Sequence, residues 1–278
     1  MECHLKGITV HYETWGMGHP VILLHGGGPD HRSLVGCMEP VFQGNQGWQR
    51  FYPDLPGLGR TRGEDWIRSS DQVLQVVQDF IRAVIPGRHF ALVGETYGAY
   101  LARGHVYREP TLVDGLMMVC PTIVMDKARR TLPEHAVLVR DEAFLAGLPV
   151  EARERFGAFA VVQTARTWQR TQEEVLAGLT VADWAFLSRL EGQGYAFSFD
   201  ADLGSVPFAR PTLILTGRQD SLVGYRDAWE VLEQYPRATF ATLDRAGHNL
   251  HIEQEGLFGA LAGEWLDRVR EGLAEAGG

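Results

Sequence analysis

The chain has 278 residues, of which 45% are hydrophobic and 22% charged. It is long enough for one large α/β domain or a domain with an insertion. The formal net charge of −9 argues against nucleic acid or an anionic membrane as the main partner, because both select basic surfaces.

The N-terminal stretch, MECHLKGITVHYE, has no basic segment followed by an apolar run, so we expect no signal peptide. No uninterrupted apolar stretch approaches the about 18 residues that would suggest a membrane span. The three cysteines, Cys3, Cys37 and Cys120, show no paired spacing. We therefore expect reduced thiols in a cytoplasmic protein and no metal site.

Short apolar runs recur along most of the chain and predict strands. The run at 21–24 ends at a glycine-rich loop, which is typical of a buried parallel strand. Further strands are predicted at residues 8–12, 50–54, 90–93, 115–120, 212–215 and 238–243.

Helical patterns separate these strands. Val73, Val77 and Val84 recur at helical spacing before Pro86 and Gly87, which predicts a helix that ends there. Residues 99–109 predict a second helix, and the chain ends in a third, with Leu257, Leu261 and Trp265 expected on one face. Alternating strands and helices predict a mostly parallel sheet with helices on both faces.

Residues 122–206 break this alternation. They are rich in Glu, Arg, Ala and Leu, contain aromatic residues such as Phe156, Trp168 and Phe186, and give almost no strand signal. We predict an α/β core formed by 1–121 and 207–278, with 122–206 as an all-helical insertion. This insertion is expected to pack internally and to lie as a lid across the strand ends.

The stretch GETYG, residues 94–98, lies between a predicted strand and a predicted helix. A glycine, a nucleophile two residues later and a second glycine form the frame of a nucleophile elbow, which usually holds serine. Here the central residue is Thr96, which carries the same hydroxyl group on a β-branched side chain.

Two further residues could complete a nucleophilic site. A hydroxyl becomes a useful nucleophile when a histidine takes its proton and a carboxylate orients that histidine. Asp220 and His248 follow Thr96 in the order nucleophile, acid, histidine, which is the order in folds with this elbow. All three are predicted beyond the carboxyl ends of strands, where open α/β sheets bind ligands.

Acyl transfer also needs hydrogen-bond donors for the developing oxyanion. In elbow folds these are the backbone N–H after the nucleophile, here Tyr97, and one from an earlier glycine-rich loop. The loop HGGGP, residues 25–29, offers Gly27 first and Gly28 second.

Together these motifs resemble the α/β-hydrolase superfamily over nearly the whole chain. The resemblance implies a roughly eight-stranded sheet, an inserted helical cap at 122–206 and catalysis without a cofactor. The chain looks most similar to the cap-bearing branch that includes carboxylesterases, C–C bond hydrolases and proline iminopeptidases. Asp54, in the segment DLPGLG, is interpreted as a structural residue that holds a turn.

Three functions remain open. The first is a hydrolase that uses Thr96 on a small ester, amide or related bond. The second is a binding protein that holds a small molecule without turnover. The third is a cofactor-free lyase or C–C hydrolase in which His248 is the base. An iminopeptidase would need acidic cap residues, for which Glu134, Asp141 and Glu142 are available; the substrate and the oligomeric state cannot be read from the sequence.

Overall fold

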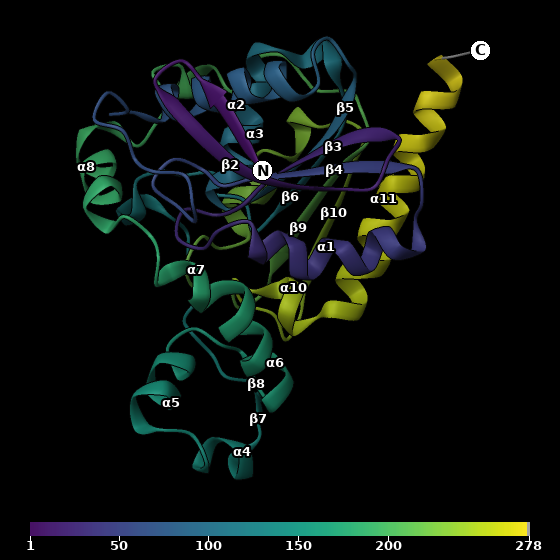
Figure 1. Ribbon diagram of the computed structural model, residues 1–278. Helices are drawn as coiled ribbons and strands as arrows, with labels where there is room; N and C mark the ends of the chain where they lie inside the picture. The colour runs from purple at the N-terminus through teal and green to yellow at the C-terminus, as the bar shows by residue number, and fades with distance from the viewer. Residues whose placement is uncertain (277–278) are drawn as a thin grey trace.

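An eight-stranded sheet forms the centre of the protein, of which a computed structural model describes residues 1–276 (Figure 1). The strand order is β1-β2-β4-β3-β5-β6-β9-β10. The strands are β1 (Glu2–Leu5), β2 (Ile8–Trp15), β3 (His19–Leu24), β4 (Trp48–Pro53), β5 (Phe90–Glu95), β6 (Val113–Val119), β9 (Thr212–Gly217) and β10 (Ala238–Leu243). Only β2 pairs antiparallel to its neighbours, β1 and β4. The predicted roughly eight-stranded, mostly parallel sheet is therefore confirmed.

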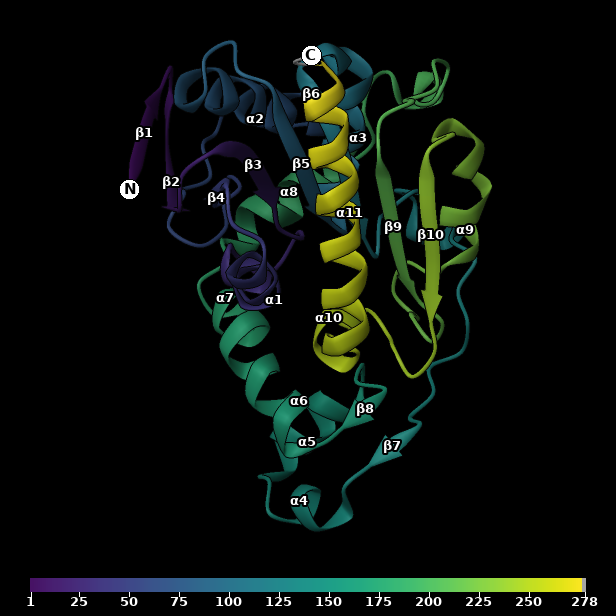
Figure 2. The same cartoon turned by 90° about the vertical axis from the view of Figure 1, so that its right-hand side faces the viewer.

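Helices cover both faces of this sheet. The helices α2 (Ser70–Val84) and α3 (Tyr97–Arg108) share one hydrophobic core with alternate strand residues such as Ile22 and Leu24. The helices α1 (Arg32–Gly44) and α11 (Glu255–Ala276) share the other with Val21 and Leu23. In Figure 2, α11 crosses the sheet face nearest the viewer. Buried on both sides, the central strands read as continuous apolar runs.

The terminal helix differs from the prediction in its buried face. Trp265 is fully buried, but Leu257 is 52% exposed. The residues that face the core are Phe258, Ala262, Trp265, Leu266 and Val269, and Leu261 packs against them, so the prediction is wrong for Leu257 alone. Leu257 precedes Trp265 by eight residues, which places it about 80° away around the helix axis, beyond the edge of the apolar stripe.

The segment between β6 and β9 carries the predicted insertion, and it is not all helical. Its helices are α4 (Glu142–Ala146), α5 (Val150–Gly157), α6 (Ala165–Arg170), α7 (Ala177–Leu179) and α8 (Trp184–Gly194), with a π-helical turn at Thr171–Leu176 between α6 and α7. Two strands of two residues each, β7 (Val139–Arg140) and β8 (Val162–Gln163), pair in parallel. The all-helical prediction is wrong there, because two-residue strands leave no alternating pattern in the sequence.

The insertion packs in two different ways. Its first half has a small core of its own, formed by Leu145, Phe156, Ala160 and Trp168. Its second half joins the core of the sheet domain through Phe186, Leu190 and Phe197. Both views place the teal segment α4–α6 beyond the arrowheads of the parallel strands (Figures 1 and 2). No described helix is both long enough and apolar enough to span a membrane.

Candidate active site

Thr96 occupies a sharp turn between β5 and α3. Its φ of 52° and ψ of −106° lie in a region that is unusual for any residue other than glycine and costs about 1–3 kcal/mol. Backbone hydrogen bonds fix the turn, since Thr96 N donates to Val119 O at 2.9 Å and Thr122 N donates to Thr96 O at 3.2 Å. The surrounding structure therefore holds Thr96 in a strained conformation.

The two glycines of the motif allow this turn. A Cβ at Gly94 would collide with the backbone of Ala99, and a Cβ at Gly98 would collide with the Leu24 carbonyl. Gly94 thus lets α3 fold back onto β5, and Gly98 lets α3 approach the end of β3.

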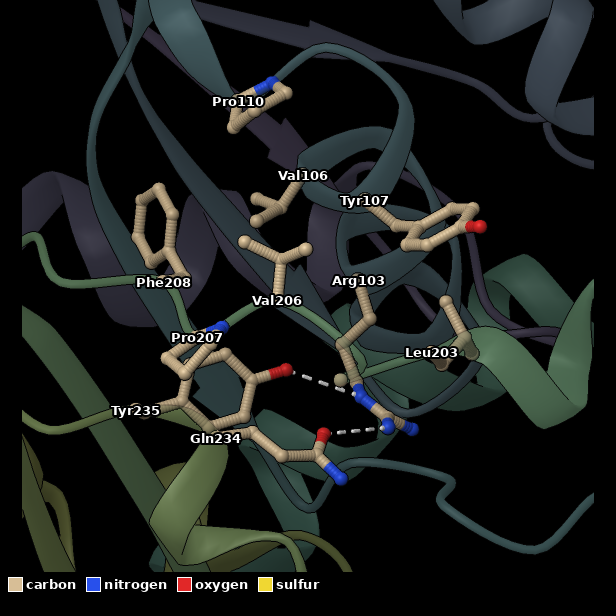
Figure 3. Close-up of a pocket in the computed structure, with 11 residues that line it drawn as sticks. Arg103, Val106, Tyr107, Pro110, Leu203, Val206, Pro207, Phe208, Gln234 and Tyr235 are labelled. Atoms are coloured by element: carbon tan, nitrogen blue, oxygen red, sulfur yellow. Dashed lines mark hydrogen bonds between the residues drawn. The ribbon is translucent and has the colours of Figure 1, made fainter.

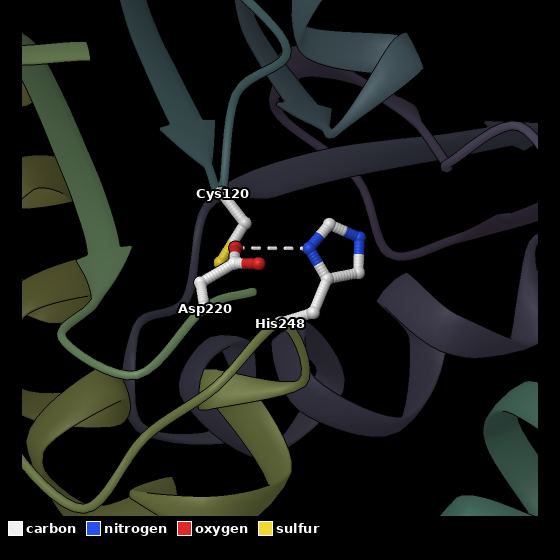
Figure 4. Close-up of side chains that lie close together, drawn as sticks. All are labelled: Cys120, Asp220 and His248. Atoms are coloured by element: carbon white, nitrogen blue, oxygen red, sulfur yellow. Dashed lines mark hydrogen bonds and ion pairs between the residues drawn. The ribbon is translucent and has the colours of Figure 1, made fainter. Parts of the chain in front are cut away.

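A hydrogen-bonded chain joins the three residues that the sequence analysis grouped. Thr96 Oγ1 lies 2.9 Å from His248 Nε2, and His248 Nδ1 lies 3.0 Å from Asp220 Oδ2 (Figure 4). The second oxygen of Asp220 accepts hydrogen bonds from the backbone N–H groups of Leu222, at 2.8 Å, and Val223, at 3.1 Å. Asp220 is fully buried, so these contacts hold its carboxylate facing the imidazole.

Charges around the imidazole favour its protonated form. Burial lowers the pKa of His248, but the Asp220 carboxylate and its hydrogen bond outweigh that effect, so the pKa lies above its ordinary value. Burial raises the pKa of Asp220, while the charge and hydrogen bond of His248 and two backbone donors bring it below the ordinary value. Asp220 is therefore ionised near neutral pH, and His248 is a base of increased strength.

Two glycines bring the loops of Asp220 and His248 together. A Cβ at Gly217, at the end of β9, would collide with the backbone oxygen of Gly247. Cys120, which follows β6 with a φ of 42°, places its thiol beside the Asp220 carboxylate (Figure 4). Burial raises the pKa of the Cys120 thiol well above its usual value.

The glycine-rich loop reaches the same region. A Cβ at Gly26 would lie 3.6 Å from Thr96 Cβ, and a Cβ at Gly27 would lie 3.3 Å from Tyr97 Cβ. Within residues 1–276, no acceptor pairs with the backbone N–H of Gly27 or of Tyr97. Gly28 lies beneath the insertion, since a Cβ there would meet Leu179 at 2.8 Å.

His25 anchors this loop from below. Its Nε2 accepts from Leu55 N at 3.0 Å, so its Nδ1 carries the proton and donates to Gly26 O at 2.8 Å. Burial lowers the pKa of His25 despite the nearby Asp54 charge. A neutral imidazole with one tautomer thus fixes the glycine loop against the end of β4.

Asp54 is not part of the hydrogen-bonded chain that joins Asp220, His248 and Thr96. Its carboxylate accepts from His31 Nδ1 at 2.7 Å and from Arg60 N at 2.9 Å, and it is buried. A Cβ at Gly59 would collide with that carboxylate. These contacts give Asp54 a turn-holding role, as interpreted from the sequence.

Tyr195, at the end of α8, is a site residue that the sequence analysis missed. Its ring stacks on the Tyr97 ring with centroids 4.8 Å apart. A Cβ at Gly27 would lie 2.9 Å from the Tyr195 hydroxyl, and that hydroxyl has no hydrogen-bond partner in the described part of the chain. Burial raises the pKa of Tyr195 above its ordinary value, so the hydroxyl remains a donor.

An aromatic clamp, formed by residues 195–199 against α3, positions Tyr195. Phe197 stacks on Tyr100 at 4.2 Å, and Phe199 stacks on Tyr107 at 5.2 Å. A Cβ at Gly104 would collide with Phe197, which explains a glycine inside the helix. The alternating aromatic residues of YAFSF, at 195–199, and the tyrosines at helical spacing in α3 were the sequence signal that could have predicted this contact.

Glu95 is a second residue that the sequence analysis did not single out. It is buried beside the turn and accepts from Ser33 Oγ at 2.7 Å. Its other oxygen lies 3.8 Å from Nδ1 of His251, whose pKa burial lowers to about 4. The Glu95 charge adds to that of Asp220 in raising the pKa of His248.

The fold, and the order of Thr96, Asp220 and His248 along it, are those of the α/β hydrolases. The family model for the alpha/beta hydrolase fold matches residues 19–255. The chain belongs to this family.

Its relatives are hydrolases and esterases. The chain is 22% identical to 2-hydroxy-6-oxo-6-(2'-aminophenyl)hexa-2,4-dienoic acid hydrolase of Metapseudomonas resinovorans, over 94% of this chain and 89% of that protein. It is 25% identical to pimeloyl-[acyl-carrier protein] methyl ester esterase of Nitrosomonas europaea, over 86% and 92% respectively. The solved structure of an alpha/beta superfamily hydrolase from Oenococcus oeni PSU-1 is similar with a TM-score of 0.88 and 29% identity, over 97% of this chain and 99% of that one.

Proposed function

We propose that the protein is a cofactor-independent hydrolase that cleaves a small ester, amide or related bond with Thr96 as nucleophile. The observation that carries this proposal is the continuous chain from Thr96 Oγ1 through His248 to Asp220, with distances of 2.9 and 3.0 Å. His248 accepts the Thr96 proton through Nε2 while Asp220 holds Nδ1 protonated and stabilises the imidazolium that forms.

The hydrolysis proceeds in two stages. Thr96 Oγ1 attacks the acyl carbon, and the N–H groups of Gly27 and Tyr97 stabilise the oxyanion. The N–H of Gly28 is the alternative donor from the glycine-rich loop. His248 then donates its proton to the leaving group. Water, deprotonated by His248, then attacks the acyl-enzyme, and as the acid leaves, His248 returns the proton to Oγ1 and restores the Thr96 hydroxyl.

The insertion acts in this proposal as a lid that completes the site. Leu179 and Tyr195 lie against the glycine loop. Glu253 connects the lid to the loop of His248, since its carboxylate accepts from Val161 N and from Gly247 N, both at 2.6 Å. Closure of such a lid excludes water and strengthens electrostatic interactions at the site.

The experiment that tests the proposal is a covalent trap combined with a substrate panel. A phosphonate reagent should add to Thr96, as located by mass spectrometry of peptides, and ester, anilide and lactone substrates should identify the bond that is cleaved. Turnover without an adduct would instead support a lyase or C–C hydrolase that uses His248 as base. If neither an adduct nor turnover is observed, the result supports a small-molecule binding protein. The backbone strain at Thr96 and its additional methyl group also favour that function.

The pH dependence of hydrolysis should follow His248. Because the base must be neutral and its pKa lies above the ordinary value of 6.5, kcat/KM should rise with pH to a midpoint above 6.5. Asp220, with a pKa below its ordinary 3.8, stays ionised throughout. A midpoint below 6.5 would contradict the assignment of His248 as a base paired with a carboxylate.

Glu253 requires a control in this measurement. Burial raises its pKa to about 6, so loss of its contacts with the lid could produce a similar profile. If the profile reports His248 and not Glu253, Glu253→Gln should leave the midpoint of the kcat/KM profile unchanged. Asp220→Asn, which removes the charge that raises the pKa of His248, should move the midpoint to lower pH.

Removal of the Tyr195 hydroxyl should slow the chemical step. Tyr195→Phe keeps the ring stacked on Tyr97 but removes a donor that faces the oxyanion loop, so we expect kcat to fall by about tenfold or more with little change in KM. Tyr12→Phe in β2 is the matched hydroxyl deletion outside the site. An unchanged kcat would limit Tyr195 to packing.

A further inference from the structure

A cavity of ≈ 60 Å³ lies where the insertion returns to the core, about two turns along α3 from its N-terminus. Its floor consists of the buried residues Arg103, Val106, Phe208 and Tyr235, and its rim includes Val206, which is 75% exposed. We call this cavity the junction pocket. Figure 3 shows that α3, the segment around 203–208 and residues 234–235 each form part of its wall.

Arg103 is the unusual feature of the junction pocket. It is only 5% exposed, yet its two hydrogen bonds go to neutral acceptors (Figure 3). Nε donates to the Tyr235 hydroxyl at 3.1 Å, and Nη2 donates to Gln234 Oε1 at 3.3 Å. No described carboxylate forms an ion pair with it. A buried cation without a counter-ion is unfavourable, so an anion bound there would be stabilised.

Gln234 and Tyr235 each keep a hydrogen-bond donor besides the oxygen that accepts from Arg103. Because Gln234 Oε1 accepts from Arg103, the amide Nε2 of Gln234 points away from the guanidinium, and it has no acceptor in residues 1–276. Tyr235 accepts from Arg103 through its oxygen, which leaves its own proton free. No acidic side chain lines the pocket. A ligand with acceptor oxygens would match the donors of Arg103, Gln234 and Tyr235, and a carboxylate offers them in the planar geometry that a guanidinium matches.

The rest of the wall is apolar and sets the body of the ligand. Val106, Val206 and Phe208 face the cavity beside the donors. We propose that the junction pocket binds a short aliphatic carboxylate, with its head on Arg103 and Gln234 and its alkyl chain on these three residues. This site is separate from Thr96 and does not depend on the proposed hydrolysis. Its occupancy stabilises the junction between insertion and core by mass action.

Titration with butyrate tests the proposal, and butyramide is the uncharged compound of the same shape. The amide resonances of Gly204, Phe208 and Gln234 report the junction pocket, and those of Gly27 and Tyr97 report the candidate active site. We expect butyrate to shift the first group and butyramide to bind about tenfold more weakly or worse. Equal binding of the two, equal binding of inorganic phosphate and butyrate, or shifts confined to Gly27 and Tyr97 would each overturn the proposal.

Two variants separate binding from folding. Arg103→Met should abolish the butyrate shifts, although loss of a buried side chain can also weaken the fold. Val206→Asp removes an apolar contact at the exposed rim that both compounds lose alike, and it adds a negative charge that acts on butyrate alone, so butyrate binding should fall by about threefold more than butyramide binding. Leu257→Asp, at a 52% exposed position on α11, adds the same charge elsewhere and should alter neither. If Val206→Asp and Leu257→Asp behave alike, the junction pocket does not bind the anion.

Discussion

Replacement of His248 by alanine is expected to reduce kcat/KM for an activated ester by at least about a thousandfold. His248 is the only described side chain hydrogen-bonded to Thr96 Oγ1, so its loss leaves the threonine hydroxyl without a base at neutral pH. The proposed oxyanion donors and the binding contacts remain, and a small residual rate is expected from them. The measurement compares purified wild type and variant on p-nitrophenyl acetate.

Two controls make this result specific. His4→Ala removes an exposed histidine on β1 and should leave kcat/KM unchanged, which excludes a general effect of histidine loss. The melting curve of His248→Ala shows whether the variant is folded, because loss of the imidazole leaves the buried Asp220 carboxylate without its partner and should lower the melting temperature. Undiminished hydrolysis by a folded His248→Ala protein would refute His248 as the base.

The features predictable from the sequence were those fixed by local pattern. Parallel strands buried on both faces appear as apolar runs, and β3 and β5 show this clearly. The turn at Thr96 was visible because Gly94 and Gly98 are needed wherever a strand and a helix approach so closely. The chain from Thr96 to Asp220 was predicted from the order of motifs, because the carboxyl ends of parallel strands meet at one edge of the sheet.

The features that escaped prediction depend on contacts between distant segments. Helix α1 contains Pro40 and Gly36, both of which disfavour helix locally, and its packing against the sheet and α11 overrides them. Tyr195 reaches Gly27 only because the aromatic clamp holds its segment against α3. No local pattern distinguishes Arg103 from a surface arginine, since its burial arises from segments more than 100 positions away in the chain.

Thr96→Ser is expected to raise kcat/KM for small activated esters by about tenfold to a hundredfold while the fold stays intact. The methyl group makes the threonine side chain stiff at χ1. Thr96 has a φ of 52°, a backbone conformation in which β-branched residues are most strained. The methyl group also occupies space where the acyl carbon approaches, and a misplacement of about 1 Å can cost about a hundredfold in rate. Thr216→Ser, which deletes the same methyl group in β9, should leave kcat/KM unchanged.

Thr96→Ala is the third member of this series, and it decides whether the hydroxyl reacts at all. The proposed base, acid and backbone donors are unaffected by this substitution, so a complete loss of hydrolysis can be attributed to the missing hydroxyl. The comparison is kcat/KM for p-nitrophenyl acetate across the serine, threonine and alanine proteins. Equal inactivity of all three would make the site a binding pocket and refute the hydrolase proposal. Should threonine exceed serine on one substrate of a wider panel, the methyl group would be a specificity element, because it would then contact that substrate favourably in the transition state.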